Sequence, residues 1–214
     1  MKDYQKINSI YERDVQKKFT DRYSLPEFEY LSVLPWNTFE KIDGTNIKIH
    51  YDPSINQHRP FRIGGRVKDS SLKFSFVECL YDIMFERLDK LKEIFYDAKN
   101  SPFTLYGEGV GPGINSNKFN KCFKKYEFIL FDVQIGHWWL KDQIVSDISN
   151  KLEIRNAPYI GALTFAEAIE FIKNKPKSIL ENHLMEGLIL KPNVQLFNRN
   201  GERIITKVKA NDFK

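Results

Sequence analysis

The stretch that decides the fold is EKIDGTN, residues 40–46. It lies between two segments rich in aromatic and β-branched residues, WNTF at 36–39 and IKIHY at 47–51. Such segments are typical of β-strands, and Asp-Gly is a common turn signal. Lys41 has three interpretations: a solvated side chain on a strand, a residue that flanks a hairpin turn, or a lysine that takes part in chemistry. The rest of the chain decides among them.

Outward from this stretch, apolar periodicity predicts strands and helices in alternation. Strands are expected at 37–51, 60–64, 102–108, 126–134, 186–192 and 203–209. Helices are expected at 4–19, at 72–95 and from a Thr-x-x-Glu capping box at 164–167 through Ile172. Strands mixed with helices in this order indicate an α+β fold with antiparallel sheet. We expect a single domain over residues 1–214, with residues 1–35 as a helical N-terminal extension.

Composition sets the class of protein. Of the 214 residues 42% are hydrophobic and 29% are charged, which is typical of a globular chain with its own core. The net charge of +5 permits a polyanionic partner without demonstrating one. The two cysteines, Cys79 and Cys122, give neither a disulfide framework nor a zinc spacing, and we expect both to be buried thiols. We see no signal peptide and no membrane-spanning run, and we expect a cytoplasmic protein.

Charged residues recur at the ends of the expected strands. They are Lys41, Asp43, Glu108, Asp132, Glu186, Lys207 and Lys209. Charges inside or at the end of apolar strands are costly unless they pair or bind a ligand. Lysines suit phosphates, whereas carboxylates suit a divalent metal, an adenine amino group or ribose hydroxyls. Together they predict a cleft lined by lysines and carboxylates.

Lys207 and Lys209 are two residues apart and share one face of the last strand. Two lysines on one face repel each other unless an anion lies between them. Positive neighbours also lower the pKa of a third lysine and so favour its neutral, nucleophilic form. We therefore expect such a site to make Lys41 reactive toward phosphorus.

These motifs, taken in order, resemble those of the covalent nucleotidyltransferases of the ligase and mRNA-capping superfamily. The matching segments are EKIDGTN at 40–46, GGRV at 64–67, YGEGVG at 106–111, LFDVQ at 130–134, EGLILKP at 186–192 and ITKVK at 205–209. Lys-x-Asp-Gly alone is a weak signal, but the ordered set is specific. The arginine expected between the first and third motifs is Arg66, with Arg62 as the fallback.

Three details resemble the RNA ligases, and most of all the nick-sealing RNA ligases of bacteriophages. They are Asn46, the EGLILKP segment and the short Lys-x-Lys ending. The resemblance implies an antiparallel-sheet nucleotidyltransferase domain, the adenylation domain of the ATP-grasp-like DNA and RNA ligase type, with flanking helices. Relatives carry a further module, such as an oligonucleotide-binding barrel, and we expect none here. A DNA ligase or a guanylyltransferase is disfavoured by Asn46 and by the missing barrel.

The implied reaction has three steps. Lys41 attacks the α-phosphate of ATP and expels pyrophosphate, the AMP moves to a 5′-phosphate RNA end, and a 3′-hydroxyl displaces the AMP. The implied partners are ATP, Mg²⁺ or Mn²⁺, and RNA with 5′-phosphate and 3′-OH ends, with nicked duplex and RNA–DNA hybrid both left open. The implied role is RNA repair by a monomer, in the host cytoplasm if the chain is viral.

The resemblance also assigns roles to residues. Lys207 and Lys209 are expected at the α-phosphate, and Glu186 at metal-bound water. The expected nucleotide contacts are Glu40 at the adenine edge, Ile42 beside it, Glu108 at the ribose and Phe131 stacked on adenine. Asp132 is expected to assist the RNA steps, and Asn46 and Arg66 to serve catalysis or an RNA phosphate.

Some alternatives stay open. GHWWL at 136–140 is either a stacking platform for bases or, more often in proteins, one ring in the core and one at its edge. NKFNKCFKK at 117–125 is either a phosphate-tracking surface or a solvated basic face. For the whole chain, the alternative from another class is a non-catalytic nucleotide- or RNA-binding module that keeps the fold.

Overall fold

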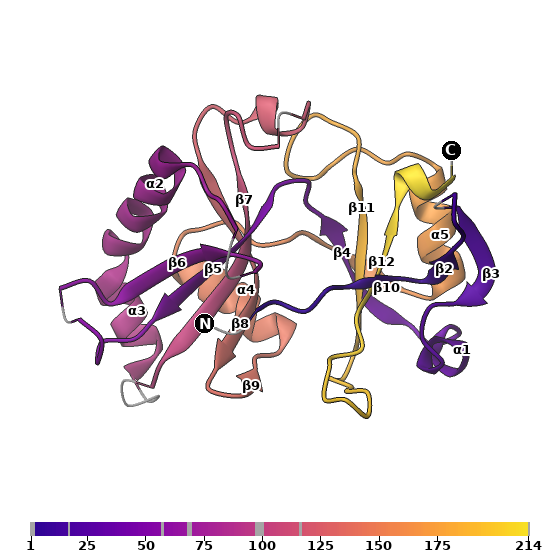
Figure 1. Cartoon of the computed structure of the whole chain (residues 1–214), viewed down its shortest axis with the longest axis horizontal. Coiled ribbons are helices and arrows are strands. Elements are labelled where there is room, and N and C mark those ends of the chain that lie inside the picture. Colours follow the sequence, from indigo (N-terminus) through magenta and orange to yellow (C-terminus); the bar gives the residue numbers. More distant parts are fainter. Residues whose placement is uncertain are drawn as a thin grey trace. The chain divides into compact units, whose positions relative to one another are not determined.

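The computed structural model describes residues 3–16, 18–56, 58–67, 70–96, 101–115 and 117–213. The chain forms two compact units (Figure 1). Unit 1 comprises Met1–Tyr4 and Asp43–Asn156, and unit 2 comprises Gln5–Ile42 and Ala157–Lys214. Each unit contains a five-stranded sheet with its own apolar core. The expectation of a single domain stays a prediction.

The sheet of unit 1 has the strand order β6-β5-β7-β8-β9, and all its neighbours are antiparallel. The strands are β5 (Thr45–Tyr51), β6 (Phe61–Gly65), β7 (Phe103–Val110), β8 (Glu127–Ile135) and β9 (Trp138–Trp139). Ile47, Ile49 and Leu105 are fully buried in the core that the sheet shares with three helices. Polar residues such as Asn46, His50 and Glu108 alternate with these apolar positions, as expected for a sheet with one buried face.

The amphipathic segment predicted as one helix over 72–95 forms two. They are α2 (Phe74–Phe85) and α3 (Leu88–Ile94). Arg87 interrupts them with φ −109° and ψ 8°, and its guanidinium donates to the carbonyl oxygens of Leu152 (2.7 Å) and Ile83 (3.0 Å). A third helix, α4 (Asp142–Lys151), packs into the same core through Val145 and Ile148 and was not predicted.

The sheet of unit 2 has the order β1-β12-β11-β4-β10. Its strands are β1 (Asn8–Ser9), β4 (Trp36–Lys41), β10 (Tyr159–Leu163), β11 (Gly187–Pro192) and β12 (Thr206–Lys209). Only the β1–β12 pair among these described strands is parallel. Helix α5 (Phe165–Lys173) packs on this sheet and begins at the predicted capping box of Thr164 and Glu167.

The predicted helix at 4–19, and with it the helical extension over 1–35, is wrong. This region contains β1, the hairpin of β2 (Tyr11–Arg13) and β3 (Phe19–Tyr23), and one short helix, α1 (Glu27–Leu31). The ring of Tyr11 stacks on that of Tyr23 at 5.2 Å, and the amide of Ile10 donates to the carbonyl of Lys207 at 3.2 Å. Cross-strand aromatic pairs and the open edge of β12 outweigh a weak helical periodicity.

The α+β class with antiparallel sheets is confirmed, although one short strand pair is parallel. The expectation of two buried thiols is wrong for Cys122, which is exposed, while Cys79 is half-buried. Within the described ranges, no helix has the length and apolar character needed to cross a membrane.

Candidate functional site

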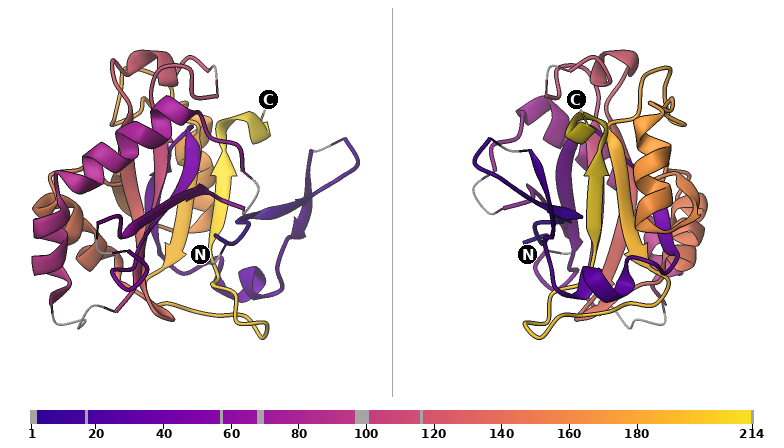
Figure 2. Two further views of the ribbon diagram at one scale, coloured as in Figure 1. Left: turned by 60° about the vertical axis from the view of Figure 1, so that its left-hand side comes forward. Right: turned by 90° about the vertical axis from the view of Figure 1, so that its right-hand side faces the viewer.

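The predicted lysines lie on β4 and β12 of unit 2, on either side of β11, and β11 and β12 run side by side in Figure 2. In the register of the sheet, Gly187 at the start of β11 is opposite Lys41 on β4 and opposite Lys209 on β12. Glu186 immediately precedes Gly187. A Cβ atom at Gly187 would lie 2.3 Å from the carbonyl oxygen of Val208, so a glycine is required for this close strand approach.

The Glu186 carboxylate bridges two ammonium groups. Its Oε2 lies 2.6 Å from Lys41 Nζ and its Oε1 lies 2.6 Å from Lys209 Nζ. The exposed fractions of the three side chains are 21% for Lys41, 17% for Glu186 and 34% for Lys209. One carboxylate thus serves two half-buried cations, which differs from the exposed ion pairs that contribute little to stability.

Lys207 is the third lysine of this cluster. Burial first, and then the charges of Lys209 and Lys41, lower its pKa to about 8. An anion bound beside Lys207 would oppose both effects and favour the protonated amine. The cluster of Lys41, Lys207, Lys209 and Glu186 therefore has an excess of positive charge that a phosphate can neutralise; we call it the lysine cluster.

Glu40 and Ile42 flank Lys41 and are both buried. The Oε2 atom of Glu40 accepts a 2.9 Å hydrogen bond from the amide of Ile179. Burial raises the pKa of this carboxyl group, although hydrogen bonds from Ser178 and Ile179 oppose that rise. The carbonyl oxygen of Ile42 is 3.5 Å from Lys41 Nζ.

Unit 1 holds the other predicted residues. Asn46 on β5 is directly opposite Glu108 on β7. The Oδ1 atom of Asn46 is buried and has no hydrogen-bond partner among the described residues, so a ligand donor could satisfy it. Arg66 is exposed and immediately follows Gly65, which pairs with Ile47, the neighbour of Asn46.

Arg62, the fallback arginine, is opposite His50, four residues farther along β5 than Asn46. Side chains on one strand face repeat every second residue, so both positions share the face, but Arg66 is at the Asn46 end of the sheet. The register therefore favours Arg66 over Arg62 as the arginine that belongs with Asn46 and Glu108.

Phe131 and Asp132 are located at a break in the pairing of β8. Asp132 is opposite Tyr106 and Leu130 is opposite Gly107, which leaves Phe131 as an extra residue. Such a bulge redirects side chains and is common beside functional sites. Tyr4, which the sequence did not single out, donates from its hydroxyl to Asp132 Oδ2 at 2.5 Å, and its ring meets that of Phe131 at 5.2 Å.

A second residue that the sequence did not single out is Asn120. Its side chain is 1% exposed and donates to the carbonyl oxygen of Asp43 at 2.6 Å. The only sequence signal was the density of asparagines in NSNKFN at 115–120, which indicates a loop rather than a particular contact.

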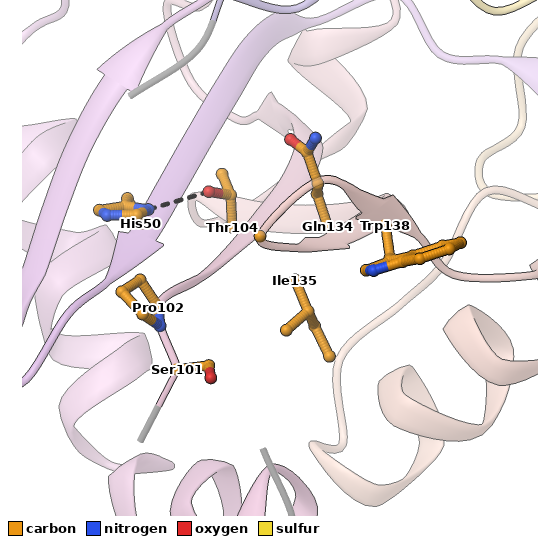
Figure 3. Close-up of a pocket in the computed structure, with 8 residues that line it drawn as sticks. His50, Ser101, Pro102, Thr104, Gln134, Ile135 and Trp138 are labelled. Carbon is orange, nitrogen blue, oxygen red and sulfur yellow. Dashed lines mark hydrogen bonds between the residues drawn. The ribbon is translucent and has the colours of Figure 1, made fainter. Parts of the chain in front are cut away.

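Unit 1 also has a pocket of about 380 Å³ at the start of β7 and the end of β8 (Figure 3). It is lined by His50, Ser101, Pro102, Thr104, Gln134, Ile135, Gly136 and Trp138. His50 Nδ1 and Thr104 Oγ1 are hydrogen-bonded at 2.9 Å, and burial lowers the pKa of the histidine. None of the predicted site residues lines this pocket. Across the described ranges, no cluster of three His, Cys, Asp or Glu side chains could hold a metal ion.

Comparison with known proteins places this chain in a family. A family model described as RNA ligase matches residues 34–209, which is well over half of the chain. Among solved structures, a mutant RNA ligase of Naegleria gruberi with ATP and Mn is 17% identical with a TM-score of 0.63, covering 98% of this chain and 56% of that one.

An apo mutant of an RNA ligase from the same organism is 19% identical with a TM-score of 0.61, covering 97% of this chain and 57% of that one. The form with PPi is 16% identical with a TM-score of 0.59, covering 98% and 62%. The chain thus spans less than two thirds of the length of these proteins, and the likeness to them is one of fold. With the family match over 34–209, it follows that the chain belongs to the RNA ligase family.

Proposed function

We propose that this chain is an ATP-dependent RNA ligase that joins a 3′-OH end to a 5′-phosphate end through a lysyl-AMP intermediate and an RNA-adenylate. The observation that carries the proposal is the lysine cluster, in which Glu186 bridges Lys41 and Lys209 at 2.6 Å each. Family membership supports it, as do the ATP and AMP complexes of the Naegleria gruberi enzyme. In this proposal the chain is an adenylation domain of the ATP-grasp-like ligase type.

In the first step, the neutral amine of Lys41 forms a bond to the α-phosphorus of ATP, and the bond from that phosphorus to the pyrophosphate oxygen breaks. Lys41 loses a proton in the process. Glu186, in hydrogen-bond contact with Nζ, orients the amine toward the phosphate. Lys207 and Lys209 donate to α-phosphate oxygens and neutralise the charge that develops there. Because phosphate raises the pKa of Lys207, nucleotide binding draws a proton onto that residue.

A divalent cation, Mg²⁺ or Mn²⁺, is implied by this chemistry. Both oxygens of Glu186 already accept from lysines, so the donor set suits an ion held mainly by ATP phosphates and water, with Glu186 contacting one of those waters. When bound, such an ion withdraws negative charge from the phosphates. Four residues of the chain itself hold or move protons and neutralise charge in this step: Lys41, Glu186, Lys207 and Lys209.

The remaining residues contact the nucleotide and the RNA. Glu40 and Ile42 are assigned to the adenine edge, Phe131 to stacking on adenine, and Glu108 to the ribose. The buried Oδ1 of Asn46, which has no hydrogen-bond partner among the described residues, accepts a hydrogen bond from the substrate. Arg66 contacts an RNA phosphate. Asp132 acts after the first step.

In the second step, an RNA 5′-phosphate oxygen attacks the AMP phosphorus and the bond to Lys41 breaks. In the third, a 3′-hydroxyl attacks the RNA 5′-phosphorus and AMP leaves. We assign this chemistry to a monomer that acts in RNA repair, on nicked duplex RNA or a nicked RNA–DNA hybrid. Its place of action is the cytoplasm.

The test is incubation with ATP labelled at the α-phosphate and Mg²⁺ or Mn²⁺, followed by denaturing electrophoresis. We expect a labelled band that pyrophosphate discharges, that Lys41→Ala abolishes and that the exposed-lysine control Lys151→Ala retains. Nicked RNA, hybrid and DNA duplexes then identify the substrate. ATP binding without a labelled band would favour the non-catalytic module, and sealing of DNA nicks alone would favour a DNA ligase.

A further inference from the structure

The loop between β7 and β8, which the structure describes at residues 111–115 and 117–126, has a strongly biased charge. Between Glu108 and Glu127 the chain has four lysines, Lys118, Lys121, Lys124 and Lys125, and no acidic residue. Lys118, Lys121, Lys124 and Lys125 are all exposed. Within the part of the chain that the structure describes, none of the four forms an ion pair. We call this segment the basic loop.

The aromatic residues of the basic loop point inward. Phe119 and Phe123 are each 4% exposed and contact each other edge to face at 5.2 Å. The guanidinium of Arg155 lies 5.8 Å from the ring centre of Phe123. The interleaved pattern of Lys and Phe thus separates into an apolar base and a basic outer surface. No phenylalanine of the loop is left to stack on a base.

A hydrogen-bonded hub fixes the base of the loop. Asn120 Oδ1 accepts from the amide of Gly111 at 2.9 Å, while its Nδ2 donates to Asp43 O at 2.6 Å and to Asn117 Oδ1 at 2.8 Å. Asn117 Nδ2 also donates to Asp43 O at 3.1 Å, and Asn115 Nδ2 donates to Gly44 O. Asn120 at the centre of the network is buried, and a buried polar side chain whose hydrogen bonds are satisfied holds one conformation.

The hub attaches the basic loop to the EKIDGTN stretch itself. Asp43 and Gly44 are the second and third residues after Lys41, and the asparagines hold their carbonyl oxygens. The lysines are therefore presented from a fixed base in unit 1, where this loop connects the end of β7 to the start of β8 (Figure 1). Pre-organised cations lose less conformational entropy when a ligand binds.

We infer that the basic loop binds the sugar–phosphate backbone of the RNA substrate, an inference that rests on the proposed ligase function and adds a substrate contact to it. The ligand is a polyanion because several lysines point outward with no carboxylate among them. Its contact is with phosphates rather than bases, because the rings of Phe119 and Phe123 are buried and lysine is a point charge without a base-reading geometry.

A second basic run offers a matched control. Lys173, Lys175 and Lys177 of unit 2 are also exposed, so neutralising them changes the net charge equally. This run has no asparagine hub, and the ammonium of Lys173 lies over the ring of Phe213 at 5.2 Å. Neutralising three lysines in each run and comparing the two variants distinguishes RNA binding at the basic loop from the general attraction of a positively charged protein for RNA.

The experiment compares Lys121→Gln, Lys124→Gln, Lys125→Gln with Lys173→Gln, Lys175→Gln, Lys177→Gln, each as a triple variant. Binding of a fluorescent nicked RNA duplex is measured from low to moderate salt, and lysyl-AMP formation is measured on the same preparations. For the basic-loop variant we expect RNA affinity to fall about 10- to 100-fold and the salt slope to become shallower by about 2 to 3. Lysyl-AMP formation should stay within about twofold of the parent chain, since no contact to ATP is removed.

Unchanged RNA affinity in the basic-loop variant, or an equal loss in the control variant, would overturn the inference. RNA binding needs no chemistry, so this result stands even if the parent chain forms no lysyl-AMP. Failure of the parent chain to form lysyl-AMP would instead count against the proposed function. The failure of the inference and the failure of the proposed function are therefore distinguishable.

Discussion

The two units present their predicted residues in opposite ways. In unit 2 charged groups meet directly, with Lys41 and Lys209 on either side of Glu186 and Lys207 nearby. In unit 1 the key acid, Asp132, is held by the neutral hydroxyl of Tyr4 and lies within an aromatic cluster. The lysine cluster concentrates positive charge, whereas the surroundings of Asp132 consist of aromatic rings and hydrogen bonds.

This difference indicates a division of labour. A cluster with excess positive charge stabilises anions, and its lysines repel one another until an anion arrives. A surface of rings, amides and held carboxylates suits a planar base and sugar hydroxyls, which require shape and hydrogen bonds more than charge. We therefore expect substitutions in the lysine cluster to affect phosphate chemistry, and substitutions around Tyr4 and Asp132 to affect stability and nucleotide fit.

The largest effect is expected for Glu186→Gln. This change leaves the lysine cluster without a carboxylate, and Lys41 without the group that orients it. We expect lysyl-AMP formation to fall at least about 100-fold and the free energy of unfolding to fall by roughly 1 to 3 kcal/mol, less than for a fully buried pair because water screens these side chains. Labelling rates and urea unfolding measure the two effects.

The control for this prediction is Glu202→Gln, at an exposed acid whose carboxylate accepts a 3.0 Å hydrogen bond from Asn198 Nδ2. It should leave both quantities unchanged. Labelling of Glu186→Gln at the rate of the parent chain would mean that the bridge between the lysines is structural only.

Tyr4→Phe should have the next largest effect, on the stability of unit 1. It removes the only hydroxyl of that side chain and leaves the Asp132 carboxylate, which is 1% exposed, without that donor. We expect a loss of about 1 to 3 kcal/mol in urea unfolding. Tyr30→Phe, at a tyrosine that is 78% exposed, should change stability by less than about 0.5 kcal/mol. Equal effects of the two substitutions would contradict the assigned role of Tyr4.

Lys207→Met tests the electrostatics of unit 2 through pH. The pKa of Lys207 is about 8 in the folded chain and lies below its unfolded value of 10.5, so the unfolded state binds more protons between these values. Stability from this group therefore rises as pH increases from 8 to 10.5. The variant lacks that rise and should be more stable than the parent chain at pH 7, by on the order of 1 kcal/mol after screening by water.

Urea unfolding of both chains at pH 7, 8.5 and 10 measures this difference. The advantage of the methionine variant should shrink as the pH rises. A difference in stability that does not vary with pH would show that the pKa of Lys207 is not lowered in the folded chain.

The smallest effect is expected for Trp138→Ala, which separates the two interpretations of GHWWL. Trp138 is 79% exposed, whereas the ring of Trp139 meets those of Tyr106 at 5.1 Å and Tyr4 at 6.0 Å. We expect Trp138→Ala to change stability by less than about 0.5 kcal/mol and Trp139→Ala to cost about 2 to 4 kcal/mol. A marked loss of RNA affinity in Trp138→Ala would instead support a stacking platform.

Much of the fold could be predicted from local pattern. The strands on either side of EKIDGTN, the buried strand before Glu108 and the capping box at Thr164 all follow from residue periodicity and turn chemistry. These signals are reliable because adjacent residues determine them. The convergence of Lys41, Glu186 and Lys209 was anticipated because charges at strand ends need partners.

What could not be predicted depends on contacts between distant residues. Tyr4 meets Asp132 across 128 positions of sequence, and β1 is a strand only because the edge of β12 is free to pair with it. Asn120 looks like any loop asparagine until its partner, the backbone of Asp43, is known. Contacts between distant residues produce no periodic pattern in the sequence. They also explain why residues 4–19 form strands although their apolar residues have a helical spacing.

The central claim is that Lys41, and neither of the other lysines in its cluster, is the nucleophile. The most direct measurement is mass spectrometry of peptides from the protein after reaction with ATP and a divalent ion, digested under conditions that preserve a phosphoramidate. The account predicts one AMP per chain, on the peptide that contains Lys41. An adduct on Lys207 or Lys209, or none on a chain that binds ATP, would contradict it.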